Sequence, residues 1–230
     1  MNGYRLLVFD WDGTLMDSQA RIVACFQAAA LDVGVAVPKA DRAKDVIGLG
    51  LQEATQRLFP DVGDVAVARV IERYRHHFLG DHPTPSELFP GVVETLEGLA
   101  DEGYLLGIAT GKSRRGLDKV LRETGLGGLF HASRCADEAF SKPHPQMLEE
   151  VMAALGAGPR DTLMIGDTEY DMQMARNAGV PGLAVSYGVH APSRLLAEGA
   201  LVCLDRIDEL PGWLAGHGWP PSFVSSEEVK

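Results

Sequence analysis

Two aspartates separated by one residue follow an apolar run near the start of the chain. The run is Leu6–Phe9, and Asp10, Asp12 and Gly13 come after it. A continuous apolar run is typical of a strand buried on both faces of a parallel sheet, and open α/β sheets bind ligands at the carboxyl ends of such strands. Because unpaired charges are costly to desolvate, these acids should lie in a solvated cleft or hold a cation.

Two simpler interpretations compete with this one. An Asp-Gly pair is a common turn, so the pattern alone is not diagnostic. A calcium-binding loop needs glycine at its sixth position and glutamate at its twelfth, but counting from Asp10 these positions hold Leu15 and Arg21. The decision therefore depends on whether later strands end in complementary residues.

Later strands do end in polar residues. Strands predicted over 104–109 and 162–165 are each followed by such residues, and a Lys-Pro pair lies between them. Each feature alone could be a helix cap, a turn or an exposed loop. Parallel strands end at one edge of a sheet, so together they would bring hydroxyl, ammonium and carboxylate groups to one place. The candidates are Thr110, Gly111, Lys112, Lys142, Asp167 and Asp171.

This set of groups fits phosphoryl transfer. Crowded carboxylates repel one another unless a hard cation lies among them, and Mg²⁺ binds through one or two carboxylates, waters and a substrate phosphate. A carboxylate can accept a phosphoryl group as a nucleophile. A second acid can protonate the leaving oxygen and later deprotonate water, while lysine and hydroxyl donors stabilise the phosphoryl oxygens.

The helical and strand patterns predict how the chain positions these groups. Between the first strand and residue 82 we expect helices and no strand, with a Gly48-Leu49-Gly50 loop and a Gly- and Pro-rich linker over 80–85. From residue 90 the two patterns alternate, which indicates right-handed βαβ units. We expect helices over 92–102, 115–124, 146–155, 170–178 and 207–215, and strands over 104–109, 130–134, 162–165, 182–185 and 201–204.

The predicted fold class is therefore α/β, with a doubly wound, mostly parallel sheet and an inserted helical subdomain, which is called the cap below because of a resemblance that follows. The α/β catalytic core would comprise residues 1–16 and 83–217, the helical cap 17–82, and a C-terminal tail 218–230. Cap helices are expected over 22–33, 40–46, 51–59 and 67–78.

The overall composition limits partners and location. The net charge of -11, without a basic cluster, argues against nucleic acid or an anionic membrane as a partner. The cysteines Cys25, Cys135 and Cys203 form no CxxC pair and are expected to be buried thiols of a reducing compartment. No signal-peptide core or membrane-length apolar run is evident, so we expect a cytoplasmic protein, monomeric or homodimeric.

Four motifs resemble, in order and spacing, those of the haloacid dehalogenase superfamily. They are Asp10-Trp-Asp12-Gly-Thr14, Thr110-Gly111-Lys112, Lys142-Pro143, and Gly166-Asp167 with Asp171 four residues later. The resemblance covers residues 4–204, and the helical insert is similar to the cap domain of that family.

The resemblance implies a role for each matching residue. Asp10 would be the nucleophile and a Mg²⁺ ligand, and Asp12 the general acid/base that also lends its main-chain carbonyl to the metal. Asp167 would complete the metal site. Asp171 would support that site without touching the metal, or would reach the metal through a water molecule. The phosphoryl group and the rest of the substrate would be bound by Thr110, Gly111, Lys112 and Lys142.

The motifs also narrow the reaction. Dehalogenases of the family lack the second acid, so Asp12 favours a phosphate ester, and residues 47–51 with Thr110-Gly111-Lys112 most resemble the phosphoglycolate phosphatase-like group. We predict a phosphatase acting on a small phosphorylated metabolite. A sugar phosphomutase remains an alternative, and a receiver-like signalling module is disfavoured by chain length and by the DxD spacing. Candidates for substrate selection in the cap are Arg42, Lys44, Gln52 and Arg57.

Overall fold

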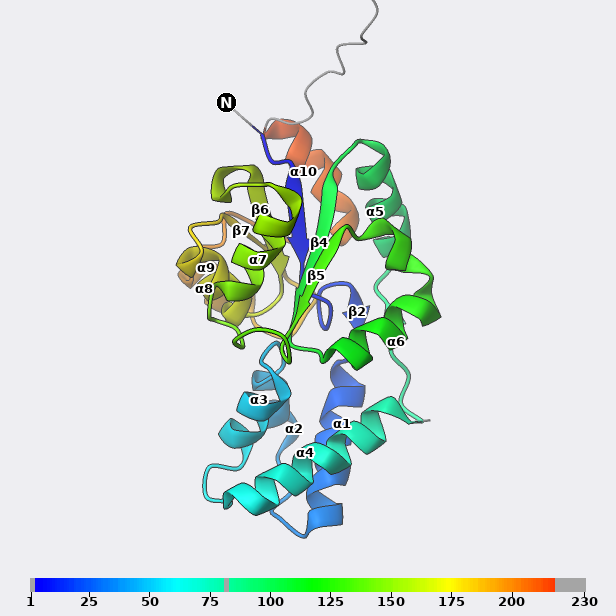
Figure 1. Cartoon of the computed structure of the whole chain (residues 1–230), viewed down its shortest axis with the longest axis vertical. Helices are drawn as coiled ribbons and strands as arrows, with labels where there is room; N and C mark the ends of the chain where they lie inside the picture. Colours follow the sequence, from blue (N-terminus) through cyan, green and yellow to red (C-terminus); the bar gives the residue numbers. More distant parts are fainter. Residues whose placement is uncertain (1–2, 81–82, 218–230) are drawn as a thin grey trace, which may run out of the picture.

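A six-stranded parallel sheet forms the centre of the computed structural model, which describes residues 3–80 and 83–217 (Figure 1). Its strand order is β5-β4-β1-β6-β7-β8. The chain adds strands first on one side of β1 and then on the other, so the switch of direction, where open α/β sheets bind ligands, falls beside β1. The bounds are β1 (Leu6–Phe9), β4 (Leu105–Thr110), β5 (Ala132–Cys135), β6 (Thr162–Gly166), β7 (Gly182–Val185) and β8 (Cys203–Leu204).

Helices cover both faces of this sheet, which explains why β1 is apolar throughout. Leu7 and Phe9 pack in one hydrophobic cluster with α5, α6 and α10, whereas Leu6 and Val8 pack in another with α7 and α8. Every side chain of β1 is therefore buried, and the doubly wound fold class is confirmed. The helices are α5 (Val92–Asp101), α6 (Arg114–Thr124), α7 (Gln146–Leu155), α8 (Glu169–Asn177), α9 (Pro192–Ala197) and α10 (Leu210–Gly216).

Some predicted elements differ from the structure. Helix α9 was not predicted, although Pro192 occupies its first turn, a position that proline favours. The last strand is shorter than expected because only Cys203 and Leu204 pair with β7, and Leu201 is exposed. The last predicted helix begins as a 3-10 turn, Ile207–Glu209, before α10. Cys25 and Cys135 are buried free thiols as expected, whereas Cys203 is only partly buried.

Four further helices lie against the carboxyl ends of the strands, at the lower end of Figure 1. They are α1 (Gln19–Val33), α2 (Ala40–Asp45), α3 (Leu51–Leu58) and α4 (Asp64–Leu79), and we call them the cap. The cap has its own hydrophobic cluster, in which the rings of Phe26 and Tyr74 lie 4.4 Å apart. The division of the chain at residues 17 and 82 stays a prediction.

A short antiparallel ribbon lies where the chain passes between the sheet and the cap. Its strands are β2 (Met16–Asp17) and β3 (Glu87–Leu88). The sequence did not reveal it, because two residues are too few to show a strand periodicity. Residues 81–82 of the predicted linker (80–85) and the predicted tail 218–230 lie outside the described residues. Among the residues described, no helix has the length and apolar character needed to cross a membrane.

Candidate active site

Asp10 lies directly after β1 and is almost completely buried. The ammonium of Lys142, which is also fully buried, lies 2.8 Å from Asp10 Oδ1 and 2.6 Å from Asp171 Oδ1. Lys142 comes from the loop before α7, and Asp171 from the first turn of α8. The other oxygen of Asp171 accepts hydrogen bonds from the main-chain nitrogen and hydroxyl of Thr168. Asp171 thus fixes Lys142 beside Asp10.

Asp167 follows β6 and completes a group of buried acids. Its Oδ1 accepts a hydrogen bond from the Thr14 hydroxyl at 2.8 Å, and its Oδ2 accepts one from the Val189 main-chain nitrogen at 2.8 Å. Gly13 has a φ of 90°, and a Cβ there would lie 2.1 Å from Asp167 Oδ2. Glycine at position 13 therefore permits both the turn and the close approach of the acid.

The carboxylates of Asp10, Asp167 and Asp171 form a compact set of oxygen donors. One oxygen from each lies within 4.8 Å of the others. Burial raises the pKa of Asp10 to about 7, against the opposing attraction of Lys142. Burial, followed by repulsion from Asp10 and Asp171, raises the pKa of Asp167 well above its usual range. Such crowded hard donors fit a divalent cation, which would relieve the repulsion.

Lys142 stays charged despite its burial. Burial acts to lower the pKa of Lys142, but attraction to Asp10 and Asp171 outweighs it, and the net shift is upward. A permanent ammonium beside Asp10 can bind an anionic group placed there.

The Asp12 side chain turns away from this set. Its Oδ1 accepts a hydrogen bond from the Ser18 hydroxyl at 2.5 Å and lies 2.8 Å from the Lys112 ammonium. The ring of Phe78, from the end of α4, lies 4.5 Å from the same ammonium. The structure thus places Lys112 against Asp12 and the cap. The sequence did not identify Ser18 and Phe78, because their contacts with Asp12 and Lys112 form only when the cap packs on the core.

Thr110 and Gly111 lie at the end of β4 that faces the cap. Thr110 is buried, and its Oγ1 accepts a hydrogen bond from the Lys112 main-chain nitrogen at 3.2 Å. A Cβ at Gly111 would lie 2.5 Å from the carbonyl oxygen of Leu49 and 2.7 Å from that of Gly48. The loop of the core and the loop of the cap are therefore in backbone contact.

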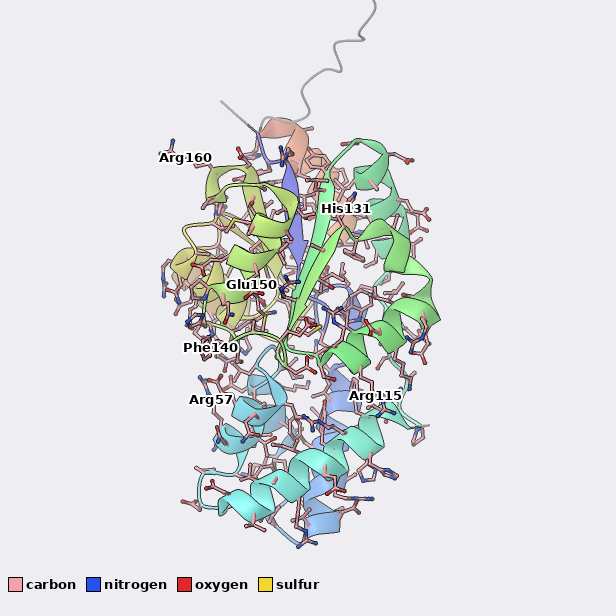
Figure 2. All side chains as sticks on the ribbon, in the orientation of Figure 1. Arg57, Arg115, His131, Phe140, Glu150 and Arg160 are labelled. Atoms are coloured by element: carbon pink, nitrogen blue, oxygen red, sulfur yellow. The ribbon has the colours of Figure 1, made fainter. Side chains whose placement is uncertain are left out.

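A cavity of about 670 Å³ connects the acids to the cap. Asp10 and Asp12 line it on one side, and the loop Gly48-Leu49-Gly50 lines it on the other. Of the four cap residues named as candidates for substrate selection, Gln52 lines the cavity, whereas Arg42 and Lys44 do not. Arg57 also points elsewhere: it pairs with Glu53 and lies over the Tyr170 ring, on the outer side of α3 (Figure 2).

Comparison with known proteins agrees with this geometry. The family model for haloacid dehalogenase-like hydrolases matches residues 7–185. The chain is 36% identical to the probable phosphatase IndB of Dickeya dadantii, covering 90% of this chain and 92% of that one. It is 30% identical to a phosphoglycolate phosphatase of Agrobacterium fabrum, over 80% of this chain and 81% of that one.

The fold comparison gives the same result. A solved haloacid dehalogenase-like hydrolase from Bacteroides fragilis superposes with a TM-score of 0.84 at 26% identity, over 90% of this chain and 99% of that one. The chain belongs to the haloacid dehalogenase-like hydrolase family. It is an enzyme, a phosphatase-like hydrolase, as its sequence motifs predicted. Membership of this family decides against the receiver-like signalling module.

Proposed function

We propose that this enzyme is a Mg²⁺-dependent phosphatase that hydrolyses a small phosphate monoester through an aspartyl-phosphate on Asp10. The observation that carries the proposal is the placement of a buried Asp10 beside the Lys142 ammonium, at the wall of a cavity that Asp12 also lines. Phosphoryl transfer to a carboxylate requires a nucleophile with an anion-binding cation beside it and a second acid at the same cavity.

The proposed reaction has two steps. A carboxylate oxygen of Asp10 attacks phosphorus, while Lys142 and the Thr110 hydroxyl bind the phosphoryl oxygens. The bond from phosphorus to the ester oxygen breaks, and Asp12 gives its proton to the departing alcohol. Asp12 then removes a proton from water, whose oxygen attacks phosphorus and releases Asp10 and inorganic phosphate. Asp12 ends the cycle protonated, as it began.

The metal site would use the carboxylates of Asp10 and Asp167 and the main-chain carbonyl of Asp12. Mg²⁺ bound there would neutralise charge on the carboxylates and the phosphoryl group. Asp171 would serve the site indirectly, because both of its oxygens are engaged by Lys142 and Thr168.

The resemblance to phosphoglycolate phosphatases makes phosphoglycolate the reference substrate within the class of small phosphorylated metabolites. A phosphomutase would use the same aspartyl-phosphate, but it would return the phosphoryl group to a sugar instead of to water. Release of free phosphate separates the two reactions.

Hydrolysis of p-nitrophenyl phosphate tests the proposal. Wild-type enzyme with Mg²⁺ should release p-nitrophenol and phosphate in equal amounts over many turnovers, and excess chelator should stop the reaction until Mg²⁺ is restored. Asp10→Asn should be inactive, whereas Asp101→Asn, an exposed acid at the end of α5, should match wild type. Full activity in chelator would refute the metal assignment, and an active Asp10→Asn would refute the nucleophile.

A further inference from the structure

The cavity above the candidate catalytic acids extends into the hydrophobic core of the cap. Its lining includes Ile22, Phe26, Ile47, Leu49, Tyr74 and Phe78. All six belong to the cap's hydrophobic cluster or pack against it. A volume of about 670 Å³ falls within the range of ligand pockets for drug-sized molecules. A two-carbon leaving group such as glycolate would leave most of this apolar space unfilled.

The charged groups of the lining do not favour a second anion on the substrate. Apart from Asp10 and Asp12, the charged lining residues are Glu53, Asp137, Arg75 and Lys112. The Lys112 ammonium is paired with Asp12, and Arg75 is exposed. A carboxylate or second phosphate held among the six apolar side chains would lose its hydration with no cation among them, which is costly.

The two outer acids are also engaged. Glu53 pairs with Arg57, and Asp137 accepts a hydrogen bond from the Arg114 main-chain nitrogen. The charge of Glu53 is compensated by Arg57, and the exposed Asp137 keeps its charge in solvent, outside the apolar part of the cavity. The lining as a whole therefore suits an uncharged leaving group.

Phe140 extends the apolar surface to the cavity's mouth. It lines the cavity, yet 67% of it is exposed, and its ring centroid lies 4.6 Å from that of His144. Figure 2 shows Phe140 at the junction between the core and the cap. An exposed phenyl ring at the entrance of an apolar cavity is positioned to cover an apolar ligand.

We propose that the substrate is a phosphate monoester of an uncharged alcohol whose apolar body, aliphatic or aromatic, is larger than two carbons. This inference rests on the proposed phosphatase function. The phosphoryl group would lie at Asp10, and the body of the alcohol would fill the cavity between the cap helices and Phe140. Hydrolysis would release that alcohol and inorganic phosphate.

A series of phosphate esters tests this substrate class on the wild-type enzyme with Mg²⁺. From methyl to hexyl phosphate, kcat/KM should rise about threefold to fourfold for each methylene buried, until the cavity is full. Hexyl and phenylethyl phosphate should exceed phosphoglycolate, inorganic pyrophosphate and phosphocholine. A preference for any of these three charged compounds, or a flat alkyl series, would overturn the inference. Failure to hydrolyse p-nitrophenyl phosphate would instead refute the phosphatase function itself.

Substitution of Phe140 provides the matched test. Phe140→Ala should lower the ratio of kcat/KM for phenylethyl over methyl phosphate by about 2–10-fold, the loss expected for one aromatic contact. Leu31→Ala is the control, because Leu31 is 69% exposed but does not line the cavity. The control should keep the wild-type ratio. An unchanged ratio in Phe140→Ala would show that Phe140 does not contact the substrate. Thermal unfolding of both variants would verify their folding.

Discussion

Asp12 Oδ1 is shared between the Ser18 hydroxyl and the Lys112 ammonium, and the Lys112 ammonium also faces the ring of Phe78 in the cap. Lys112 thus has two possible roles. It can bind the substrate, as the sequence suggested, or it can hold Asp12 in place for proton transfer. The 2.8 Å contact with Asp12 favours the second role.

Lys112→Gln distinguishes these two roles when its kcat is compared for esters with poor and good leaving groups. Asp12→Asn should lower kcat about 10²–10⁴-fold for alkyl esters, and less for p-nitrophenyl phosphate, whose good leaving group needs little protonation. If Lys112 positions Asp12, Lys112→Gln should show the same dependence on the leaving group, with a smaller loss. Equal losses for alkyl and aryl esters would instead indicate a substrate-binding role. Lys39→Gln, at an exposed lysine of the cap, is the control.

At the scale of residues, the sequence pointed to the charged groups of the site but not to the side chains that contact Asp12 and Lys112. Asp10, Asp167 and Lys142 could be identified because each lies in a short motif placed after a strand or between strands, and the structure brings them together. Ser18 and Phe78 could not, because their contacts with Asp12 and Lys112 depend on how the cap sits on the core. No local pattern encodes such a contact.

At the scale of elements, the cap loop and the loop after β4 are in contact through their backbones. Gly111 allows this contact, since any Cβ there would approach the carbonyl oxygens of Gly48 and Leu49. The same two loops border the cavity. We therefore expect their fit to affect how closely the cap approaches Asp10 and Asp12.

Gly111→Ala should disturb this fit without unfolding the protein. The added methyl group would clash with backbone atoms of the cap loop, so the loop must move. A displacement of about 1 Å can lower activity about 100-fold. Steady-state kcat/KM with alkyl phosphates measures the effect. Gly98→Ala is the matched control, because a Cβ at Gly98, within α5, would meet nothing within 4 Å. Equal activities in the two variants would contradict the proposed importance of the loop contact.

The main elements were predictable because the core is regular. The buried strands are apolar runs, and the helices that cover them have apolar residues at helical spacing. For this reason α7 and β7 were predicted with their observed bounds. The β2–β3 ribbon and α9 were missed because short elements carry little periodicity and are stabilised by tertiary contacts.

At the scale of the whole molecule, the buried acids link stability to pH. Burial raises the pKa of Asp10 to about 7 and that of Asp167 well above its usual range, so both bind protons more tightly when folded. Their contribution to the free energy of unfolding is therefore complete below about pH 4 and is lost as the pH rises through the folded pKa.

The variant Asp167→Asn isolates this effect from other titrating groups. Without metal, the free energy of unfolding of wild type, relative to that of Asp167→Asn, should fall as the pH rises above about 4, because the unfolded wild-type chain releases the Asp167 proton that the folded protein retains. Urea denaturation at a series of pH values measures the difference. A difference that rises with pH would show that Asp167 is stabilised in its charged form even without metal.

Binding of Mg²⁺ should offset the loss of stability that the buried acids cause at higher pH. Since the carboxylates must be deprotonated to bind a cation, Mg²⁺ should raise Tm more at pH 8 than at pH 5. Asp167→Asn should lose most of this rise, and Asp101→Asn should keep it. An equal rise in all three proteins would indicate binding of Mg²⁺ away from the buried acids.

Detection of the phosphorylated enzyme tests the central claim most directly. Asp12→Asn, which lacks the proposed general acid/base, is mixed with p-nitrophenyl phosphate and Mg²⁺, quenched in acid, digested and analysed by mass spectrometry. The account predicts one acid-stable, hydroxylamine-sensitive phosphoryl group, on Asp10. A phosphoryl group on another residue, or full turnover by Asp10→Asn, would contradict it.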